Sequence, residues 1–505
     1  MLSKVRAAAL SGIEAIPVEV EVNNGPGDTG TVIVGLPDAA VRESRDRVGT
    51  AITNGGYRVA LGWTTINLAP ADLKKEGPSF DLPIAIGMLA ASEQIESNRL
   101  DDFMLVGELA LSGAVRPIKG TLPIALAAKA AGCKGVLVPP ENADEAAVVD
   151  GLEVIPVKNL REAAAFLEGD LNLKQRKIDT HALFETSVNG ELDMADVKGQ
   201  DGVKRALEIA AAGGHNLMLI GPPGTGKSML AKRFATILPP LTLGEALETT
   251  KIHSVVGLLS GGQALVTQRP FRAPHHTASD AGLLGGGVNP SPGEISIAHN
   301  GVLFLDELPE FKRSVLETMR QPLEDGIVTI SRAAGTITFP SCFMLIAAMN
   351  PTPDGKMPSE SRSSPREIQN YLGRISGPLL DRIDLHIEVS QVKFREMTSE
   401  DTGESSAAIR ERVIAARCLQ HARLKKTPCN ARMGTRELKT HCALVAENKE
   451  LLRQAMDELQ LSARAYDRIL KMARTIADLD AADVIGPAHL SEAIQYRSLD
   501  RQFWG

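Results

Sequence analysis

The stretch NLMLIGPPGTGKSML, residues 216–230, limits the possible folds of this chain more than any other feature. The apolar run from Leu217 to Ile220 predicts a short buried strand, and MLAKRFATIL predicts a helix directly after the loop. Residues 221–228 fit G-x-x-x-x-G-K-S, the pattern of a phosphate-binding loop, in the strand–loop–helix context that this pattern requires. We therefore expect an α/β nucleotide-binding domain.

Each residue type of this loop suits phosphate binding. Glycines let the backbone curl so that its N–H groups face the phosphates, and the start of the helix adds its dipole. Lys227 is expected to reach the β- and γ-phosphates, and Ser228 to bind Mg²⁺. The predicted ATP- and Mg²⁺-binding residues are Gly221, Pro222, Pro223, Gly224, Thr225, Gly226, Lys227 and Ser228.

A second strand that ends in carboxylates is predicted at GVLFLDEL, residues 301–308. Asp306 would hold Mg²⁺ through water together with Ser228, and Glu307 would activate the attacking water. Taken alone, the stretch could be a buried strand capped by two solvated acids. Its place after the phosphate loop favours a catalytic pair.

Three further polar residues are expected near the γ-phosphate. The buried strand FMLIAAMN ends in Asn350, which would sense the γ-phosphate and could also start a turn before Pro351. Arg382 in GPLLDRIDL could supply charge to a neighbouring subunit's ATP, which can raise the hydrolysis rate by about 10³–10⁵. Alternatively, Arg382 could pair with Asp381 or Asp384 at the surface. Arg464 is expected at the start of a C-terminal helix.

Composition is that of a globular chain of two to four domains, with 43% hydrophobic and 23% charged residues among 505. No apolar run is long enough to span a bilayer, and Glu14 interrupts the first stretch too early for a signal peptide. Five scattered cysteines favour a reducing compartment, so a cytoplasmic protein is expected.

The C-terminal region is more basic than the rest of the chain. Residues 410–505 contain 17 Lys and Arg against 12 Asp and Glu, compatible with a phosphate-binding surface or with ordinary solvated helices.

The periodicity of the sequence predicts four regions. Residues 1–170 alternate strand-like and Ala-rich helical runs, residues 171–195 read as a linker, residues 196–390 contain the nucleotide site, and residues 391–505 read as a helical domain. In ARAYDRILKMARTIADLD, Ile469, Met472, Ala473 and Ile476 fall on one helix face.

Residues 196–505 resemble an AAA+ ATPase of the branch that includes the magnesium chelatase motor subunit and the MCM helicases. RPFRAPHHT is similar to the chelatase-like ComM/YifB family, and LEDGIVTISRAAGTITFP resembles the hairpin before the sensor strand in that branch. The resemblance implies a P-loop αβα core with a helical lid and a ring, expected to be a hexamer. It also implies that Asn350 is the first sensor, Arg382 the arginine finger and Arg464 the second sensor.

One departure from the family pattern lies after the sensor strand. Where many members carry cysteines there, this chain has Thr352, Asp354, Ser361 and Ser363, so we predict no structural zinc.

The N-terminal region resembles a second family. The stretches KEGPSFDLPIAIGMLAAS and VGELALSGAVRPIKGTLPIALAAKAAGCKGVLVP are similar to Lon-type proteases, which implies a Lon-protease-like (ribosomal S5 domain 2-like) α+β fold.

The Lon-type reaction needs a Ser–Lys dyad, in which a neutral amine takes the hydroxyl proton. Ser79 matches the serine loop, but the alignment puts Leu122 at the lysine position, and leucine cannot act as a base. Ser79 is therefore expected to be a loop or capping residue. A peptidase would require Lys119 or Lys75 as a substitute base.

The full-length arrangement resembles the ComM/YifB family, whose members are implied to be hexameric ATP-driven helicases that promote branch migration during natural transformation. Single-stranded or branched DNA is the implied partner, with Arg332, Lys312 and Arg313 as candidate contacts, and no membrane partner is expected. Two alternatives are a chelatase-type motor that acts on a metal-insertion or protein partner, and an ATP-dependent Lon-like peptidase.

Overall fold

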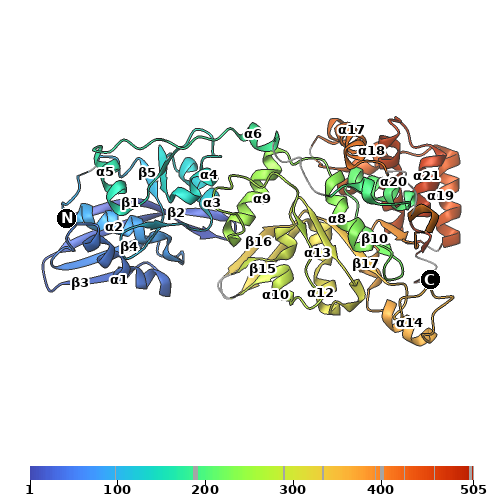
Figure 1. The fold of residues 1–505 in the computed structure, drawn as a ribbon, viewed down its shortest axis with the longest axis horizontal. Helices are drawn as coiled ribbons and strands as arrows, with labels where there is room; N and C mark the ends of the chain where they lie inside the picture. The colour runs from blue at the N-terminus through green and yellow to red at the C-terminus, as the bar shows by residue number, and fades with distance from the viewer. Residues whose placement is uncertain are drawn as a thin grey trace. The chain divides into compact units, whose positions relative to one another are not determined.

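The computed structural model describes residues 1–505 except 97, 186–191, 288–289, 333–334, 393, 398–402, 426, 460, 500–502 and 504–505. The chain forms two compact units (Figure 1). The N-terminal unit contains Met1–Ser187 and Thr242–Thr267, and the C-terminal unit contains Val188–Leu241 and Gln268–Gly505. Among the described helices, none combines the length and apolarity that a bilayer crossing requires.

The N-terminal unit is built on a seven-stranded mixed sheet. Its strands, in spatial order, are β3 (Gly30–Val34), β4 (Trp63–Ala69), β2 (Glu14–Gly25), β1 (Leu2–Ser11), β5 (Phe103–Leu105), β8 (Gly135–Val138) and β9 (Glu153–Pro156). A separate short pair joins β6 (Glu108–Leu109) to β7 (Val115–Arg116). The helices are α1 (Ala39–Asn54), α2 (Asp81–Ala91), α3 (Thr121–Ala130), α4 (Ala143–Ala146), α5 (Leu160–Glu168), α6 (Thr180–Glu185) and α9 (Leu243–Val256). The alternation of strands and Ala-rich helices expected over residues 1–170 is present, with strands at VEVEV, TVIVGL and VLVPP and helices at IAIGMLAAS and LPIALAAKAAG.

Helix α9 lies within the sequence of the predicted nucleotide-binding region, yet it belongs to the N-terminal unit. It packs against α3, where the Gly120 amide donates to the Ser254 carbonyl at 3.2 Å. The Ser254 hydroxyl donates to the buried carboxylate of Glu145, which also accepts the Leu122 amide at 2.7 Å. These long-range polar contacts explain why the grouping differs from the boundary expected from local sequence patterns.

The loop that carries Ser79 is organised around a buried carboxylate two residues later. Asp81 is fully buried and accepts hydrogen bonds from Ser44, from the Arg47 guanidinium at 3.0 and 3.1 Å, and from the Leu109 amide at 3.2 Å. One side chain therefore ties α1, α2 and β6 together. Because three donors converge on it, removing the carboxylate leaves several polar groups without an acceptor.

The C-terminal unit has a five-stranded parallel sheet in the order β11 (Phe271–Arg272), β14 (Val302–Leu305), β17 (Met344–Met349), β10 (Leu217–Ile220) and β18 (Leu385–Glu388). Its helices are α7 (Asp201–Gly213), α8 (Lys227–Ile237), α10 (Asp280–Leu284), α11 (Glu294–Ile297), α12 (Arg313–Thr318), α13 (Arg320–Asp325), α14 (Pro365–Leu372), α15 (Gly377–Leu380) and α16 (Phe394–Met397). Short strands β12 (Gly285–Gly286) and β13 (Ser291–Pro292) pair, and the predicted hairpin is present as β15 (Ile327–Arg332) and β16 (Gly335–Pro340).

Five helices follow this core and gather at one end of the C-terminal unit (Figure 1). They are α17 (Ser406–Leu424), α18 (Thr435–His441), α19 (Ala446–Leu459), α20 (Ala463–Leu479) and α21 (Pro487–Gln495). The apolar face predicted on α20 is confirmed, because all four of its residues are buried. Buried ion pairs add to this packing, since Asp384 meets Arg468 of α20 and accepts the Asn216 amide at 3.0 Å.

We predict that Asp81→Ala destabilises the N-terminal unit by about 3 kcal/mol, because it breaks a buried ion pair. The estimate is at the low end of the usual range, since the Arg47 side chain is 25% exposed and can regain water. Unfolding by denaturant can be followed by the fluorescence of Trp63 in a Trp504→Phe background, which leaves one tryptophan. Ser79→Ala in the same loop should change stability by less than about 0.5 kcal/mol. Equal effects of the two substitutions would contradict this role of Asp81.

Candidate nucleotide site

The predicted phosphate loop, the carboxylate pair and Asn350 surround one pocket of about 360 Å³. The pocket lies where β10, β14 and β17 end. Because all three strands are parallel, their carboxyl ends meet at the same edge of the sheet. The residues that line the pocket are Pro223, Gly224, Thr225, Gly226, Lys227, Ser228, Met229, Asp306, Glu307, Met349 and Asn350.

The backbone of the loop has the shape that phosphate binding needs. Gly224 and Gly226 have φ angles of 80° and 89°, a left-handed conformation that a side chain would strain. The Thr225 hydroxyl donates to the Pro222 carbonyl at 2.9 Å and closes the curve. Helix α8 begins at Lys227, so its free N–H groups and dipole point towards the pocket.

Lys227 is held at the centre of the site by oxygen acceptors. Its ammonium donates to the Gly221 carbonyl at 2.6 Å, the Pro222 carbonyl at 2.8 Å and the Asn350 side-chain oxygen at 3.2 Å. Desolvation lowers the pKa of Lys227 from its ordinary value, while the charges of Asp306 and Glu307 oppose that shift. Negative phosphate oxygens would favour the charged amine in the same place.

The oxygen atoms that could act as ligands of a magnesium ion lie close to each other. The Ser228 hydroxyl donates to the Asp306 carboxylate at 2.7 Å, and hydroxyl, carboxylate and water oxygens are ligands that Mg²⁺ prefers. A bound Mg²⁺ would neutralise charge on the phosphates. Asp306 also accepts the backbone amide of Glu307 at 3.0 Å, which fixes its second oxygen.

Glu307 has a left-handed backbone, with φ 53° and ψ 50°, a strained conformation for a residue with a side chain. Its carboxylate lies 3.4 Å from the imidazole of His276, whose ring contacts those of His275 and Phe311. The motif RPFRAPHHT therefore supplies a group that orients Glu307. The sequence pattern marked the motif as distinctive but gave no sign of this contact.

Gln200 is a second residue that sequence patterns did not identify. It has φ 58° and its side-chain amide donates to the Thr225 carbonyl at 3.0 Å and the Ser390 carbonyl at 3.2 Å. It thus connects the phosphate loop to the segment after β18. The sequence around it, GQDG before α7, predicts a turn and gives no sign of these contacts.

The two predicted arginines lie elsewhere. Arg382 and Arg464 line a separate pocket of about 290 Å³ and not the one around the phosphate loop. Arg464 lies 3.7 Å from Asp381, and its side chain is 60% exposed. The suggested surface pair of Arg382 with Asp381 or Asp384 is wrong, because Arg382 is buried and forms its ion pair with Glu324.

The four positions that replace the family's cysteines are connected by hydrogen bonds. The Asp354 carboxylate accepts from the Thr352 hydroxyl at 2.7 Å, the Ser361 hydroxyl at 2.8 Å and the Arg362 amide at 2.9 Å. The Ser363 amide donates to the Ser361 hydroxyl at 3.1 Å. These hydrogen bonds hold the pKa of Asp354 well below its usual range, and the bond from the Thr352 hydroxyl has the largest effect. Within the described residues, no group of three or more His, Cys, Asp or Glu could hold a metal ion.

Comparison with known proteins agrees with this geometry. Three family models match: magnesium chelatase subunit ChlI over residues 193–397, subunit ChlI of Mg-chelatase over residues 18–142, and the ChlI C-terminal region over residues 403–497. The uncharacterized protein YifB of Escherichia coli is 47% identical over 502 residues, which cover 99% of this chain and 98% of that protein. The competence protein ComM of Haemophilus influenzae is 46% identical over 506 residues, with the same coverage.

The chain belongs to the ComM/YifB family. Lon protease 2 of Bacillus subtilis is 35% identical over 94 residues, which cover 18% of this chain and 17% of that protease. The fold class expected from the sequence is therefore confirmed, with an AAA+ P-loop core, C-terminal helices and a Lon-like component. The AAA+ relationship of the ComM/YifB family indicates ATPase activity and use of nucleotide with Mg²⁺.

We predict that Lys227→Ala weakens ATP binding by about 10- to 150-fold, since a hydrogen bond to a charged group contributes about 1.5–3 kcal/mol. Glu307→Gln should bind ATP normally but hydrolyse it about 10²–10⁴ times more slowly, because the substitution removes the base and keeps the phosphate-binding loop. Binding of a fluorescent ATP analogue and phosphate release measure the two effects. Lys232→Ala, an exposed position on the same helix, serves as the control. Wild-type affinity in Lys227→Ala would contradict the site.

Proposed function

We propose that this protein is an ATP-driven ring motor that moves along DNA and promotes branch migration during recombination and natural transformation. The observation that carries the ATP-driven part is the convergence of Lys227, Ser228, Asp306, Glu307 and Asn350 on one pocket. The DNA-directed part is supported by full-length similarity to a competence protein. We propose a hexamer on the basis of the ComM/YifB resemblance, and the position of the predicted finger outside its own nucleotide pocket supports action between subunits.

In the proposed cycle, Lys227 and the loop amides bind the phosphates, and Ser228 with Asp306 hold Mg²⁺. Glu307 accepts a proton from the attacking water, and the contact with His276 directs its carboxylate. Asn350 contacts Lys227 and so lies where it can respond to the loss of the γ-phosphate.

Arg382 and Arg464 would act on the ATP of a neighbouring subunit. Both arginines line the same pocket, away from their own phosphate loop. Helix α20 contacts the acids on both sides of Arg382. Arg464 lies near Asp381, and Arg468 forms an ion pair with Asp384. A movement of the helical domain would therefore move the finger.

The candidate DNA contacts remain proposals. Lys312 and Arg313 are exposed at the start of α12, just after the carboxylate pair. Arg332 ends strand β15, and its side chain lies outside the described residues.

The contacts of the N-terminal unit disfavour the peptidase alternative. Leu122 is fully buried at the position where the resemblance requires a lysine. The Lys75 ammonium donates to the Pro70 carbonyl, and the Lys119 stem lies against Gly257. The Lys75 ammonium is thus engaged elsewhere. A chelatase-type motor remains the second candidate, because the matching family models are those of a chelatase subunit.

We predict that single-stranded or branched DNA raises the ATPase rate, with little preference for base sequence. Binding should weaken with salt, with a log–log slope of about −0.7 per phosphate contacted. Lys312→Glu/Arg313→Glu should make that slope shallower, whereas Lys174→Glu/Lys177→Glu, an equal charge change at exposed lysines, should not. Rates and affinities can be measured by phosphate release and fluorescence anisotropy. An ATPase indifferent to every DNA form would favour the chelatase-type alternative.

We also predict that Arg382→Ala keeps ATP binding and loses about 10³-fold in hydrolysis, because a finger supplies charge to the transition state. Mixing Arg382→Ala with Glu307→Gln subunits should restore part of the turnover, since some interfaces then hold an intact finger and an intact base. The control mixes Arg382→Ala with the double variant Arg382→Ala/Glu307→Gln, in which no interface is complete. Restoration at no mixing ratio would count against a finger that acts between subunits.

A further inference from the structure

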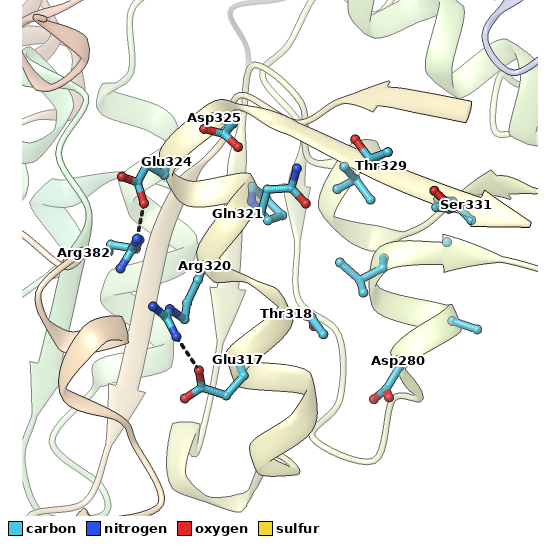
Figure 2. Close-up of a pocket in the computed structure, with 16 residues that line it drawn as sticks. Asp280, Glu317, Thr318, Arg320, Gln321, Glu324, Asp325, Thr329, Ser331 and Arg382 are labelled. Atoms are coloured by element: carbon cyan, nitrogen blue, oxygen red, sulfur yellow. Dashed lines mark hydrogen bonds and ion pairs between the residues drawn. The ribbon is translucent and has the colours of Figure 1, made fainter. Parts of the chain in front are cut away.

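One ion pair of the C-terminal unit joins the proposed arginine finger to a helix outside the nucleotide site (Figure 2). Glu324 of α13 pairs with Arg382, which lies 58 residues further along the chain. Both residues border the pocket of about 290 Å³ that also contains Arg464, and both border a larger pocket of about 780 Å³. The proposed finger therefore has a specific partner outside its own segment.

The two partners differ in exposure. The Arg382 side chain is 8% exposed, whereas the Glu324 side chain is 61% exposed. An ion pair with one well-solvated partner adds little to the stability of a fold, because the exposed charge interacts almost as well with water. The pair can still orient the buried partner, since a guanidinium donates only in fixed directions. The contact is thus better suited to orienting Arg382 than to stabilising the unit.

Among the described residues, one carbonyl and one carboxylate hold the guanidinium. Its Nη1 donates to the Pro378 carbonyl at 2.6 Å, one turn earlier in the same segment, and its Nη2 donates to Glu324. Each of these terminal nitrogens carries a second hydrogen. Glu324 therefore fixes the guanidinium and leaves one N–H on each terminal nitrogen for a phosphate oxygen, which is the group that a finger must reach.

Glu324 is itself held on a well-packed element. Helix α13 ends at Gly326, whose amide donates to the Pro322 carbonyl at 3.0 Å and whose carbonyl accepts the Ser341 amide at 2.8 Å. Pro322 and Leu323 are buried. A polar side chain on a packed helix defines the position of its partner more closely than one on a loop would.

The charges around Glu324 keep it ionised. The hydrogen bond from Arg382 lowers the pKa of Glu324 most, and the charges of Arg464 and Arg468 lower it further, while desolvation opposes them. The other two arginines face acids of the finger segment. Arg382 is therefore the arginine whose orientation depends on Glu324.

We propose that Glu324 is a positioning residue, which holds the Arg382 guanidinium in the orientation that meets the ATP of the next subunit. The inference rests on the proposed function, in which Arg382 acts between subunits. In this role Glu324 makes no contact with ATP and acts only through Arg382. Preorganised donors accelerate a reaction, because they need no reorientation when charge develops in the transition state.

The first test compares kcat with KM. Glu324→Ala should lower kcat about 10- to 100-fold, because a misplaced catalytic group can cost that much in rate. KM for ATP and binding of the fluorescent ATP analogue should stay as in the wild type, since the phosphate loop is intact. Glu324→Gln keeps a hydrogen-bond acceptor and should recover part of the loss. Phosphate release measures the rates.

The adjacent acid supplies the matched control. Asp325 is exposed, borders the same larger pocket and forms no ion pair among the described residues. Figure 2 shows it beside Glu324 without a line to Arg382. Asp325→Ala removes the same charge from the same helix, so its kcat should equal that of the wild type.

A double variant tests whether Glu324 acts through Arg382. Adding Glu324→Ala to Arg382→Ala should cause no further loss of kcat, because there is then no finger to position. An independent role of Glu324 would instead add its full loss to that of Arg382→Ala.

Mixed rings test on which side of the interface Glu324 acts. Mixing Glu324→Ala with Glu307→Gln subunits should raise hydrolysis above the average of the two, since some interfaces then combine an oriented finger with an intact base. Mixing Glu324→Ala with Arg382→Ala should give no such rise, because every finger side then lacks one of the two residues.

Several outcomes would overturn this role of Glu324. They are hydrolysis by Glu324→Ala at or above the wild-type rate, additive losses in the double variant, a rise on mixing with Arg382→Ala, and loss of ATP binding or of assembly in sedimentation velocity. If Arg382→Ala hydrolyses ATP as the wild type does, or if its mixtures with Glu307→Gln never regain activity, the proposed finger fails instead.

Discussion

The backbone hydrogen bonds that hold β17 between β10 and β14 determine the geometry of the nucleotide site. Parallel pairing brings the ends of the three strands to one edge, where each strand continues into a different polar group. Asn350 consequently lies between the loop that carries Lys227 and the strand that carries Asp306. This order explains the direct contact between Lys227 and Asn350 and the short distance from Ser228 to Asp306. Without this strand order the same residues would form no site.

The helical domain is stabilised by two buried carboxylates, Asp384 and Asp478, that pair with arginines. Desolvation opposes ionisation of Asp384, but Arg468 and His215 outweigh it and hold the pKa of this carboxyl well below its usual range. Asp478 is similarly buried between Arg423 and Arg474. A buried charge without its partner costs several kcal/mol, so these pairs favour one arrangement of α20 against the core. Because Asp384 closely follows Arg382 in the chain, the same pairs set the position of the proposed finger.

In the N-terminal unit a comparable network surrounds the position of the missing base. Glu145 accepts hydrogen bonds from Leu122, Asn142 and Ser254, and burial raises the pKa of its carboxyl despite these donors. Stability from a raised carboxyl pKa is present at low pH and decreases as pH rises through the folded-state value. The Lon-like fold is thus retained while the site of its expected lysine is used to hold α9, which follows the phosphate-loop helix in the chain.

Local patterns were sufficient for much of this protein. The strands before the phosphate loop and the carboxylate pair, the sensor strand, the hairpin and the apolar face of α20 follow from runs and periodicity that any segment carries by itself. The family motifs identified the fold class. The tertiary structure decided the rest: Glu324 as the partner of Arg382, His276 against Glu307, Gln200 on the phosphate loop, and α9 in the N-terminal unit. These contacts join residues far apart in sequence or depend on side-chain direction, and no local pattern specifies which distant polar group will satisfy a buried charge.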